Sequence, residues 1–197
     1  MDFGFTNDTN IGSIFYTSMQ AVPAFLPSVL AGKNIPCLIP LGFDQDKHFL
    51  LSRDVISKLG YYKPAIMHCR FMPGLGGMDK EGKMSASEPL TTIYTTDSPK
   101  EVENKIKKYA FSGGKDTIKE HREKGGNPDV DVSYQYLTFF EEDDKKLMKT
   151  YNDYKSGSLL TSELKEITIE KINNFLKKHQ ANRERAKKEV DKFVFKE

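Results

Sequence analysis

The sequence has 197 residues, a length that fits one large domain or two small ones. Its 30 Lys and Arg residues nearly balance 28 Asp and Glu residues, so overall charge does not favour nucleic-acid binding, and any such surface must be local. Hydrophobic residues make up 38% of the chain, which excludes a disordered polypeptide.

The sequence lacks the features of a membrane or secreted protein. The longest stretch without a charge, residues 9–32, contains polar side chains and two prolines, so we expect no membrane span and no membrane partner. The first residues do not combine the basic and apolar regions of a secretory signal. Cys37 and Cys69 lie in apolar sequence, which favours reduced core thiols in a cytoplasmic protein over a disulfide framework.

Charge divides the chain into two parts. Residues 1–96 carry 8 basic and 8 acidic side chains, whereas residues 97–197 carry 22 basic and 20 acidic side chains. Seven of the nine prolines also lie in the first part. These shifts predict two domains, residues 1–96 and 97–197, with a boundary near residues 95–99.

Residues 1–96 have the pattern of an α/β fold. A strand, a glycine turn, a helix and a second strand follow one another at the spacing of a βαβ unit with parallel strands. Such sheets bind ligands beyond the carboxyl ends of their strands, so residues 42–46 and the loop after Phe71 are the places to look for a site. The predicted elements are a helix over 13–30 interrupted by Pro23 and Pro27, a buried strand over 35–41, a helix over 46–59 and a strand over 65–71.

Residues 97–197 show helical patterns throughout, which predicts an all-α domain. Ser98, Pro99 and Glu101 form the capping pattern of a helix start. Apolar residues between 162 and 194 recur at the spacing of a long amphipathic helix. The predicted helices are residues 98–111, a short segment capped by Asp116, and residues 130–140, 143–155 and 162–194.

A lysine and two serines follow a glycine-rich segment after the second predicted strand. Residues 83–87 read Lys-Met-Ser-Ala-Ser, and three glycines lie within residues 73–77. An ammonium group on a mobile loop can approach a triphosphate and neutralise the charge that develops on departing pyrophosphate. The alternative interpretation is a flexible surface loop whose lysine is merely solvated.

The turn after the first predicted strand has groups suited to a nucleotide and an amine. Gly42 permits close approach of a ligand, and the Asp44 carboxylate can accept hydrogen bonds from both hydroxyls of a ribose. Gln45 can bind an amine or a carboxylate. Alternatively, Asp44 and Gln45 only cap the helix that follows.

Three segments together resemble the class I aminoacyl-tRNA synthetases. Residues 83–87 resemble the second signature of this class, in the form found in eukaryotic tryptophanyl-tRNA synthetases. Residues 37–45, followed by residues 53–55, resemble the nucleotide-contacting strand and turn that the tyrosyl and tryptophanyl enzymes share. Residues 110–140 resemble the anticodon-binding region of the eukaryotic tryptophanyl enzymes.

The resemblance implies a fold and a reaction. Residues 1–96 would form the second half of a Rossmann-like nucleotide-binding domain with parallel strands, and residues 97–197 a helical anticodon-binding domain. The tryptophan carboxylate would attack the α-phosphorus of ATP, and the resulting tryptophanyl-adenylate would pass its acyl group to tRNA-Trp. Mg²⁺ would accompany ATP, held by phosphates and water, so no tightly bound protein-ligated metal is expected. The resemblance also implies a homodimer for the full-length enzyme.

The resemblance also assigns roles to particular residues. Taken alone, the sequence around Gln20 favours a helix-surface amide, and Asp116 is equally well interpreted as a helix cap. Lys115 lies at a position where the family has an arginine, so a compact ammonium charge replaces a planar guanidinium group with several fixed donors. The implied roles are Lys83 and Ser85 in catalysis, with Lys83 stabilising the pyrophosphate leaving group; Asp44, Lys83, Met84 and Ser85 in ATP binding; Gln20, the Cys37 main chain and Gln45 in tryptophan binding; and Lys115 and Asp116 in anticodon binding.

One signature of the family is missing from this sequence. The class I synthetases carry His-x-Gly-His at the start of the nucleotide-binding fold, and none of the four histidines here lies in such a sequence. We therefore expect the chain to correspond to the carboxy-terminal half of the enzyme and to be inactive by itself. Two alternatives remain open: a tyrosine-tRNA ligase, and a non-catalytic tRNA-binding module that uses basic stretches at 105–108 and 183–188.

Overall fold

The computed structural model describes residues 4–77 and 82–193, and the chain divides into two compact units, Met1–Phe71 and Met72–Glu197. Each unit is considered by itself. Within the described ranges, none of the helices combines the length and the apolar character needed to cross a bilayer.

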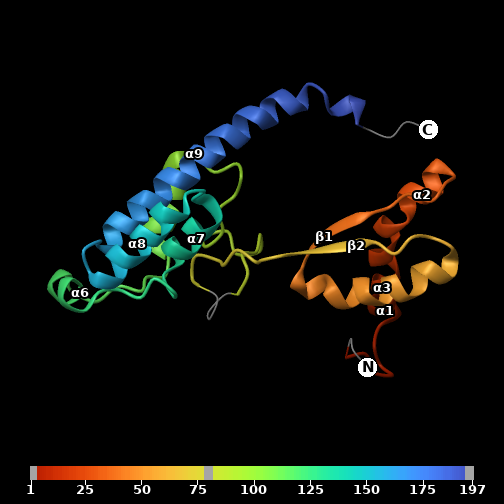
Figure 1. Ribbon diagram of the computed structural model, residues 1–197, viewed down its shortest axis with the longest axis horizontal. Helices are drawn as coiled ribbons and strands as arrows, with labels where there is room; N and C mark the ends of the chain where they lie inside the picture. The colour runs from red at the N-terminus through yellow and green to blue at the C-terminus, as the bar shows by residue number, and fades with distance from the viewer. Residues whose placement is uncertain (1–3, 78–81, 194–197) are drawn as a thin grey trace. The chain divides into compact units, whose positions relative to one another are not determined.

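The first unit is built around a βαβ element (Figure 1). Its two strands pair in parallel, with a register that runs from Leu38 opposite Ala65 to Gly42 opposite Cys69. This pairing confirms the predicted βαβ arrangement. The elements are α1 (Ile11–Ala21), the 3-10 turn Val22–Ala24, α2 (Leu26–Ala31), β1 (Leu38–Gly42), the 3-10 turn Phe43–Gln45, α3 (Asp46–Ile56), the 3-10 turn Ser57–Leu59 and β2 (Ala65–Cys69).

The helical pattern before β1 is interrupted as predicted. The Asn10 side chain accepts a hydrogen bond from the Gly12 amide at 2.7 Å and caps α1, so the helix begins at Ile11. Pro23 and Pro27 lie in the first turns of the two short helices that follow, where a missing N–H leaves no intrahelical bond unmade. The chain therefore turns twice before it enters β1.

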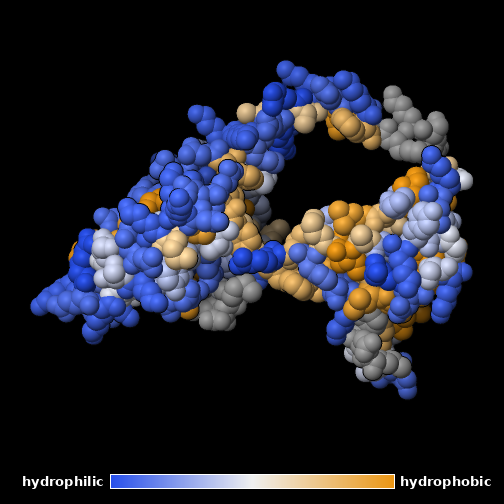
Figure 2. Space-filling model, viewed as in Figure 1, coloured by the Kyte–Doolittle hydropathy of each residue, from blue (hydrophilic) through white to orange (hydrophobic). Residues whose placement is uncertain are grey.

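The predictions of a buried first strand and of core thiols are wrong. In β1 only Leu41 is buried, whereas Leu38 is 57% exposed and Met67 of β2 is 48% exposed. Cys37 is half-buried and Cys69 is exposed. An apolar run predicts burial only where further elements cover both faces of the sheet, and the sheet described here has two strands. Figure 2 shows the resulting apolar surface as orange patches on this unit.

The second unit is a helical assembly with two connected groups of buried side chains. One group includes Leu75, Val102, Ile106, Tyr136 and Ile172, and the other joins Tyr134, Leu137, Tyr154 and Leu164. The helices are α5 (Pro99–Tyr109), α6 (Ile118–Lys124), α7 (Val132–Phe140), α8 (Asp144–Ser156) and α9 (Thr161–Lys187), followed by the 3-10 turn Val190–Lys192.

Two helix limits in the second unit differ from the predictions. Thr117, not Asp116, caps α6, because the Thr117 side chain accepts a hydrogen bond from the Glu120 amide at 3.1 Å. The last helix ends at Lys187 instead of continuing to Val194, which lies outside the described residues. The capping box predicted at Ser98 and Glu101 is present.

The compact units divide the chain earlier than the shift in charge does. Leu75 is 1% exposed in the helical core, and its carbonyl accepts a hydrogen bond from the Phe111 amide at 2.7 Å. Met72, Met84 and Ile93 pack against the same core. The number of charged residues in a segment reflects its exposure to solvent and gives no information on these contacts. The boundary between the two compact units therefore lies after Phe71, and the boundary between functional domains at 96/97 stays a prediction.

Candidate functional site

The turn after β1 holds Asp44 at the carboxyl end of a strand. Gly42 precedes it, and a Cβ at Gly42 would lie 2.5 Å from the Phe71 ring and 3.0 Å from Asp44 Oδ1. Only glycine, which has no Cβ, lets the Phe71 ring and the Asp44 side chain lie this close to the main chain at position 42. Asp44 is exposed within this turn, as expected of a carboxylate that can reach a ligand beyond the sheet.

Gln20, on α1, is joined to α3 through its neighbours. The Gln20 Nε2 donates a hydrogen bond to the Tyr16 hydroxyl at 2.5 Å, and the Tyr16 ring meets the His48 ring edge-on with centroids 5.4 Å apart. Thr17 Oγ1 and His48 Nδ1 are 3.1 Å apart. Because His48 is in the first turn of α3 and Gln45 directly precedes that helix, these contacts bring the helix that carries Gln20 to the turn that carries Gln45.

Cys37 directly precedes β1 and contacts the turn that follows α1. Its thiol donates to the Pro23 carbonyl at 3.6 Å, and Pro23 lies in the turn directly after α1. The first unit therefore gathers Gln20, Cys37 and Gln45 on elements that contact one another. Their roles in tryptophan binding stay a prediction.

His68 is a residue at this edge of the sheet that sequence reasoning missed. Its Nε2 lies 2.6 Å from Asp46 Oδ1, within hydrogen-bond distance, and its ring stacks on Phe43 at a centroid distance of 4.9 Å. These contacts connect β2 to the turn after β1 and to the first residue of α3. Its position near the carboxyl end of the second predicted strand was the signal available in the sequence.

Lys83, Met84 and Ser85 belong to the second unit. Their main chain is held by an antiparallel bridge between Pro73 and Lys83, and the Met84 amide donates to the Met72 carbonyl at 2.8 Å. The Ser85 carbonyl accepts a hydrogen bond from the Thr92 hydroxyl at 2.5 Å. Lys83 is exposed.

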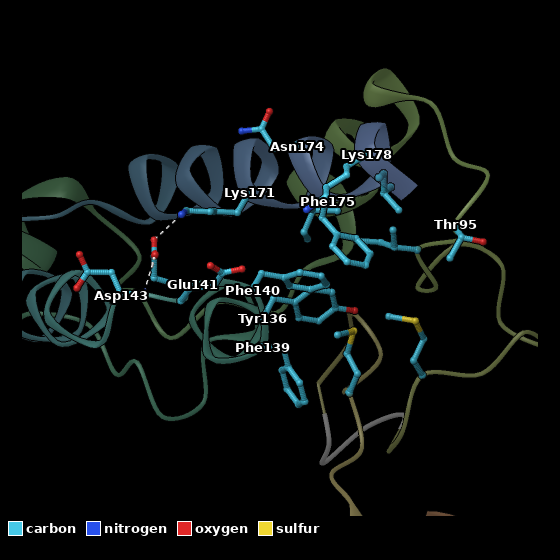
Figure 3. Close-up of a pocket in the computed structure, with 16 residues that line it drawn as sticks. Thr95, Tyr136, Phe139, Phe140, Glu141, Asp143, Lys171, Asn174, Phe175 and Lys178 are labelled. Atoms are coloured by element: carbon cyan, nitrogen blue, oxygen red, sulfur yellow. Dashed lines mark hydrogen bonds and ion pairs between the residues drawn. The ribbon is translucent and has the colours of Figure 1, made fainter. Parts of the chain in front are cut away.

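The Met84 side chain lines a cavity of about 1050 Å³ within the second unit (Figure 3). Phe140 and Phe175 both line it and contact each other edge-on, with ring centroids 5.2 Å apart. An ion pair between Lys171 Nζ and Glu141 Oε2, at 2.7 Å, lies at one side. The cavity therefore has an apolar interior and a charged rim.

Lys115 and Asp116 are both exposed on the loop that leads to α6. The loop is anchored by Asp131, which is fully buried and accepts hydrogen bonds from the Gly113 amide at 2.9 Å and the Tyr154 hydroxyl at 2.7 Å. Burial, together with the negative charge of Asp131, raises the pKa of Tyr154 to about 12. Since Asp116 does not cap α6, its carboxylate is not needed for the helix start.

The basic stretches proposed for tRNA phosphates are largely ion-paired. Lys107 Nζ lies 2.6 Å from Glu103 Oε1 and 2.7 Å from Glu166 Oε1, and hydrogen bonds to both carboxylates raise the pKa of Lys107 to about 12. Lys105 pairs with Asp97 at 2.7 Å. Near the end of α9, Lys187 pairs with Glu184 at 2.6 Å. These carboxylates reduce the net positive charge offered to a phosphate backbone.

No cluster of three or more His, Cys, Asp and Glu side chains that could hold a metal ion occurs in residues 4–77 and 82–193. Carboxylates, thiols and imidazoles are the side chains that bind Zn²⁺ and Ca²⁺. The residues of the candidate site are instead amides, hydroxyls, a carboxylate and an ammonium group, which are donors and acceptors for organic ligands.

Comparison with known proteins identifies the class. The family model described as tRNA synthetases class I (W and Y) matches residues 2–177, so the chain belongs to this family. The parallel strands of the first unit are thus part of a Rossmann-like class I synthetase fold.

Within the family, the relatives named below are tryptophan enzymes. The chain is 53% identical to the tryptophan-tRNA ligase of Sulfurisphaera tokodaii, over 98% of its own length and 49% of the relative's. It is 47% identical to the cytoplasmic tryptophan-tRNA ligase of Homo sapiens, over 96% of this chain and 41% of the relative. The structure of tryptophanyl-tRNA synthetase from Giardia lamblia superposes with a TM-score of 0.79 at 37% identity, covering 92% of this chain and 51% of that one. The chain spans about half the length of the curated relatives it matches.

Proposed function

We propose that this chain supplies part of a cytoplasmic tryptophan-tRNA ligase, which activates L-tryptophan with ATP and transfers it to tRNA-Trp. The observation that carries the proposal is an identity of about half over nearly the whole chain to proteins named for this activity. In this reaction the carboxylate of tryptophan attacks the α-phosphorus of ATP, and pyrophosphate leaves. No covalent enzyme intermediate is required, so catalysis depends on holding the reactants and stabilising charge.

We assign the binding of the reactants to two groups of residues. Gln20, Gln45 and the Cys37 main chain would bind the amino group of tryptophan. Asp44 would accept hydrogen bonds from the adenosine ribose, and Mg²⁺ would accompany the phosphates of ATP. Lys83 would stabilise the pyrophosphate, with Met84 and Ser85 against ATP. The contacts between α1, Cys37 and the start of α3 support the first group.

We further propose that residues 97–197 form an anticodon-binding domain, with Lys115 and Asp116 reading bases. The exposure of both side chains on a loop anchored by Asp131 supports this assignment. Lys115 is a flexible point charge, so its contribution to base recognition would be less directional than that of an arginine. We expect the full-length enzyme to act as a homodimer.

The test is tryptophan-dependent exchange of labelled pyrophosphate into ATP. Two proteins are assayed. One is the 197-residue chain alone, and the other, the restored protein, joins the chain in the natural order to the part of the 53% identical relative that the chain does not cover. We expect exchange only in the restored protein, with tryptophan and not with tyrosine. Tyrosine-dependent exchange would support the tyrosine alternative, and a restored protein without exchange would overturn the proposal. Exchange by the 197-residue chain alone would overturn its assignment as an inactive part.

A variant tests the role of Lys83 within the same assay. We expect Lys83→Ala to lower the exchange rate about a hundredfold, because the developing charge on pyrophosphate loses its counter-charge. Lys100→Ala removes an exposed lysine from the same unit and is the matched control. Equal rates for the two variants would contradict the role of Lys83. Salt-dependent tRNA binding without any exchange would instead favour the tRNA-binding module.

A further inference from the structure

Two side-chain hydroxyls hold the main chain that follows Lys83. Thr92 Oγ1 donates a hydrogen bond to the Ser85 carbonyl at 2.5 Å. The Tyr94 hydroxyl donates to the Ala86 carbonyl at 3.0 Å. A carbonyl oxygen can only accept a hydrogen bond, so the hydroxyl is the donor in both cases. Two successive peptide groups after Lys83 are therefore attached to the chain that follows them.

The two hydrogen bonds differ in their access to water. Thr92 is 5% exposed, and Ser85, whose carbonyl it holds, is half-buried. Ala86 is exposed, so water can replace the Tyr94 hydroxyl if that bond is lost. A bond from a buried hydroxyl has no such substitute. Thr92 is therefore the donor whose loss has the larger effect.

Thr92 is itself fixed to α5 by Lys105. The Lys105 Nζ donates to the Thr92 carbonyl at 2.9 Å and to Asp97 Oδ2 at 2.7 Å. The same ammonium group lies over the Tyr94 ring, 4.7 Å from its centroid. Asp97 is 7% exposed, so separating this ion pair would leave a buried charge without a partner. A helix thus sets the position of Thr92.

The main chain at Lys83 and Met84 is also held. Lys83 forms an antiparallel bridge with Pro73, and the Met84 amide donates to the Met72 carbonyl at 2.8 Å. The Met84 side chain packs against the helical core. Fixing a main chain costs conformational entropy, and these contacts offset that cost before any ligand binds. The Lys83 side chain therefore extends from a main chain that is already in place.

We propose that Thr92 is a positioning residue whose hydroxyl, by holding the Ser85 carbonyl, keeps Lys83 where its ammonium group can reach the pyrophosphate of ATP. This inference rests on the proposed function, because it takes Lys83 to stabilise the leaving pyrophosphate. Thr92 itself does not contact the substrate. Since additional charge on the pyrophosphate develops only in the transition state, a displaced Lys83 lowers kcat and leaves the KM values unchanged.

The holding role is tested first on the 197-residue chain without ligand. Hydrogen exchange followed by mass spectrometry reports on residues 84–88, where the Met84 and Glu88 amides are hydrogen-bonded. Thr92→Val keeps the shape of the side chain without the donor, and it should raise exchange in this segment about threefold to tenfold. Thr92→Ser keeps the donor and should exchange like the wild type.

Thr168 offers a matched control in the same unit. It is 1% exposed and donates to the Ser133 carbonyl at 3.0 Å, so Thr168→Val makes the same chemical change at another place. Exchange in residues 84–88 should keep its wild-type rate in this variant. Unchanged exchange in Thr92→Val would overturn the inference while leaving the proposed function untouched. An equal rise in Thr168→Val, or in peptides from α9, would overturn it as well, because the effect would then be a general destabilisation.

The effect on catalysis is then measured in the restored protein. Thr92→Val should lower kcat for tryptophan-dependent pyrophosphate exchange about tenfold, the effect of one hydrogen bond, with the KM for ATP and the KM for tryptophan unchanged. Thr92→Ser should recover the wild-type kcat. An unchanged kcat in Thr92→Val, or a loss larger than that in Lys83→Ala, overturns the inference. A wild-type restored protein without exchange overturns the proposed function, and the catalytic role of this hydrogen bond with it.

A double variant separates positioning from an effect on folding. If Thr92 acts through Lys83, its hydroxyl has no ammonium group to position once Lys83 is replaced. In a Lys83→Ala background, Thr92→Val should therefore lower kcat by less than about twofold. The full loss of about tenfold in that background would mean that Thr92 acts on the fraction of folded protein, and would overturn the inference.

Discussion

Replacing Asp131 by alanine should destabilise the helical unit more than an ordinary loss of a helix cap. The Asp131 side chain is fully buried and accepts from the Ser133 amide at 2.9 Å at the start of α7. It also accepts from the Gly113 amide and from the Tyr154 hydroxyl. The substitution therefore removes a helix cap and two long-range hydrogen bonds together.

The magnitude follows from the partners left behind. Losing the cap costs about 1 kcal/mol. The buried Gly113 amide loses its acceptor, which costs about 1–3 kcal/mol. Tyr154 keeps Thr161 as a partner at 3.1 Å, so it adds little. We expect the free energy of unfolding to fall by about 2–4 kcal/mol in total.

The matched control is Asp143→Ala. Asp143 caps α8 by accepting from the Lys145 amide at 2.9 Å, but its side chain is exposed and has no comparable long-range role. This variant should lose about 1 kcal/mol. Urea unfolding followed by far-ultraviolet circular dichroism measures both, on the transition of the helical unit. If Asp131→Ala costs no more than Asp143→Ala, the reasoning from the buried network is refuted.

Three further outcomes follow from local geometry. An absorbance titration should show one tyrosine that ionises at about pH 12, and this tyrosine should be missing in Tyr154→Phe. Because folding raises the pKa of Tyr154, the stability that its protonated hydroxyl contributes is present below about pH 10 and is lost between about pH 10 and 12. Ser98→Ala should lower the free energy of unfolding by about 1 kcal/mol in urea, whereas an unchanged value would contradict the capping box. Gly125→Ala should lower the thermal unfolding midpoint far more than Gly60→Ala. Both glycines have positive φ, but only at Gly125 would an added Cβ clash with the main chain, 1.8 Å from the Lys155 carbonyl oxygen. Equal midpoints for the two variants would refute the steric argument.

The local signals in the sequence were sufficient for most elements. The capping pattern at Ser98 and the apolar spacing of α9 depend on neighbours three or four residues away, so they can be read without the fold. Asp116 was misassigned because it stands beside Thr117, an equally good cap. The extended backbone of Thr117 selects it, and that conformation is not visible in composition.

Features that depend on distant residues could not be predicted. Asp131 is recognisable in the sequence as a cap before α7, but its bond to Tyr154 joins residues 23 positions apart. Tyr16 and Gln20 have helical spacing that indicates contact, whereas the support from His48 requires α1 to pack on α3. The exposure of Leu38 likewise depends on what covers the sheet.

The uncovered sheet of the first unit has a practical consequence. A parallel pair of strands is too small to be independently stable, and each described strand has an outer edge whose main-chain groups can pair with another polypeptide. Preparations of the 197-residue chain should therefore become polydisperse as concentration rises. Light scattering at increasing protein concentration should detect this self-association.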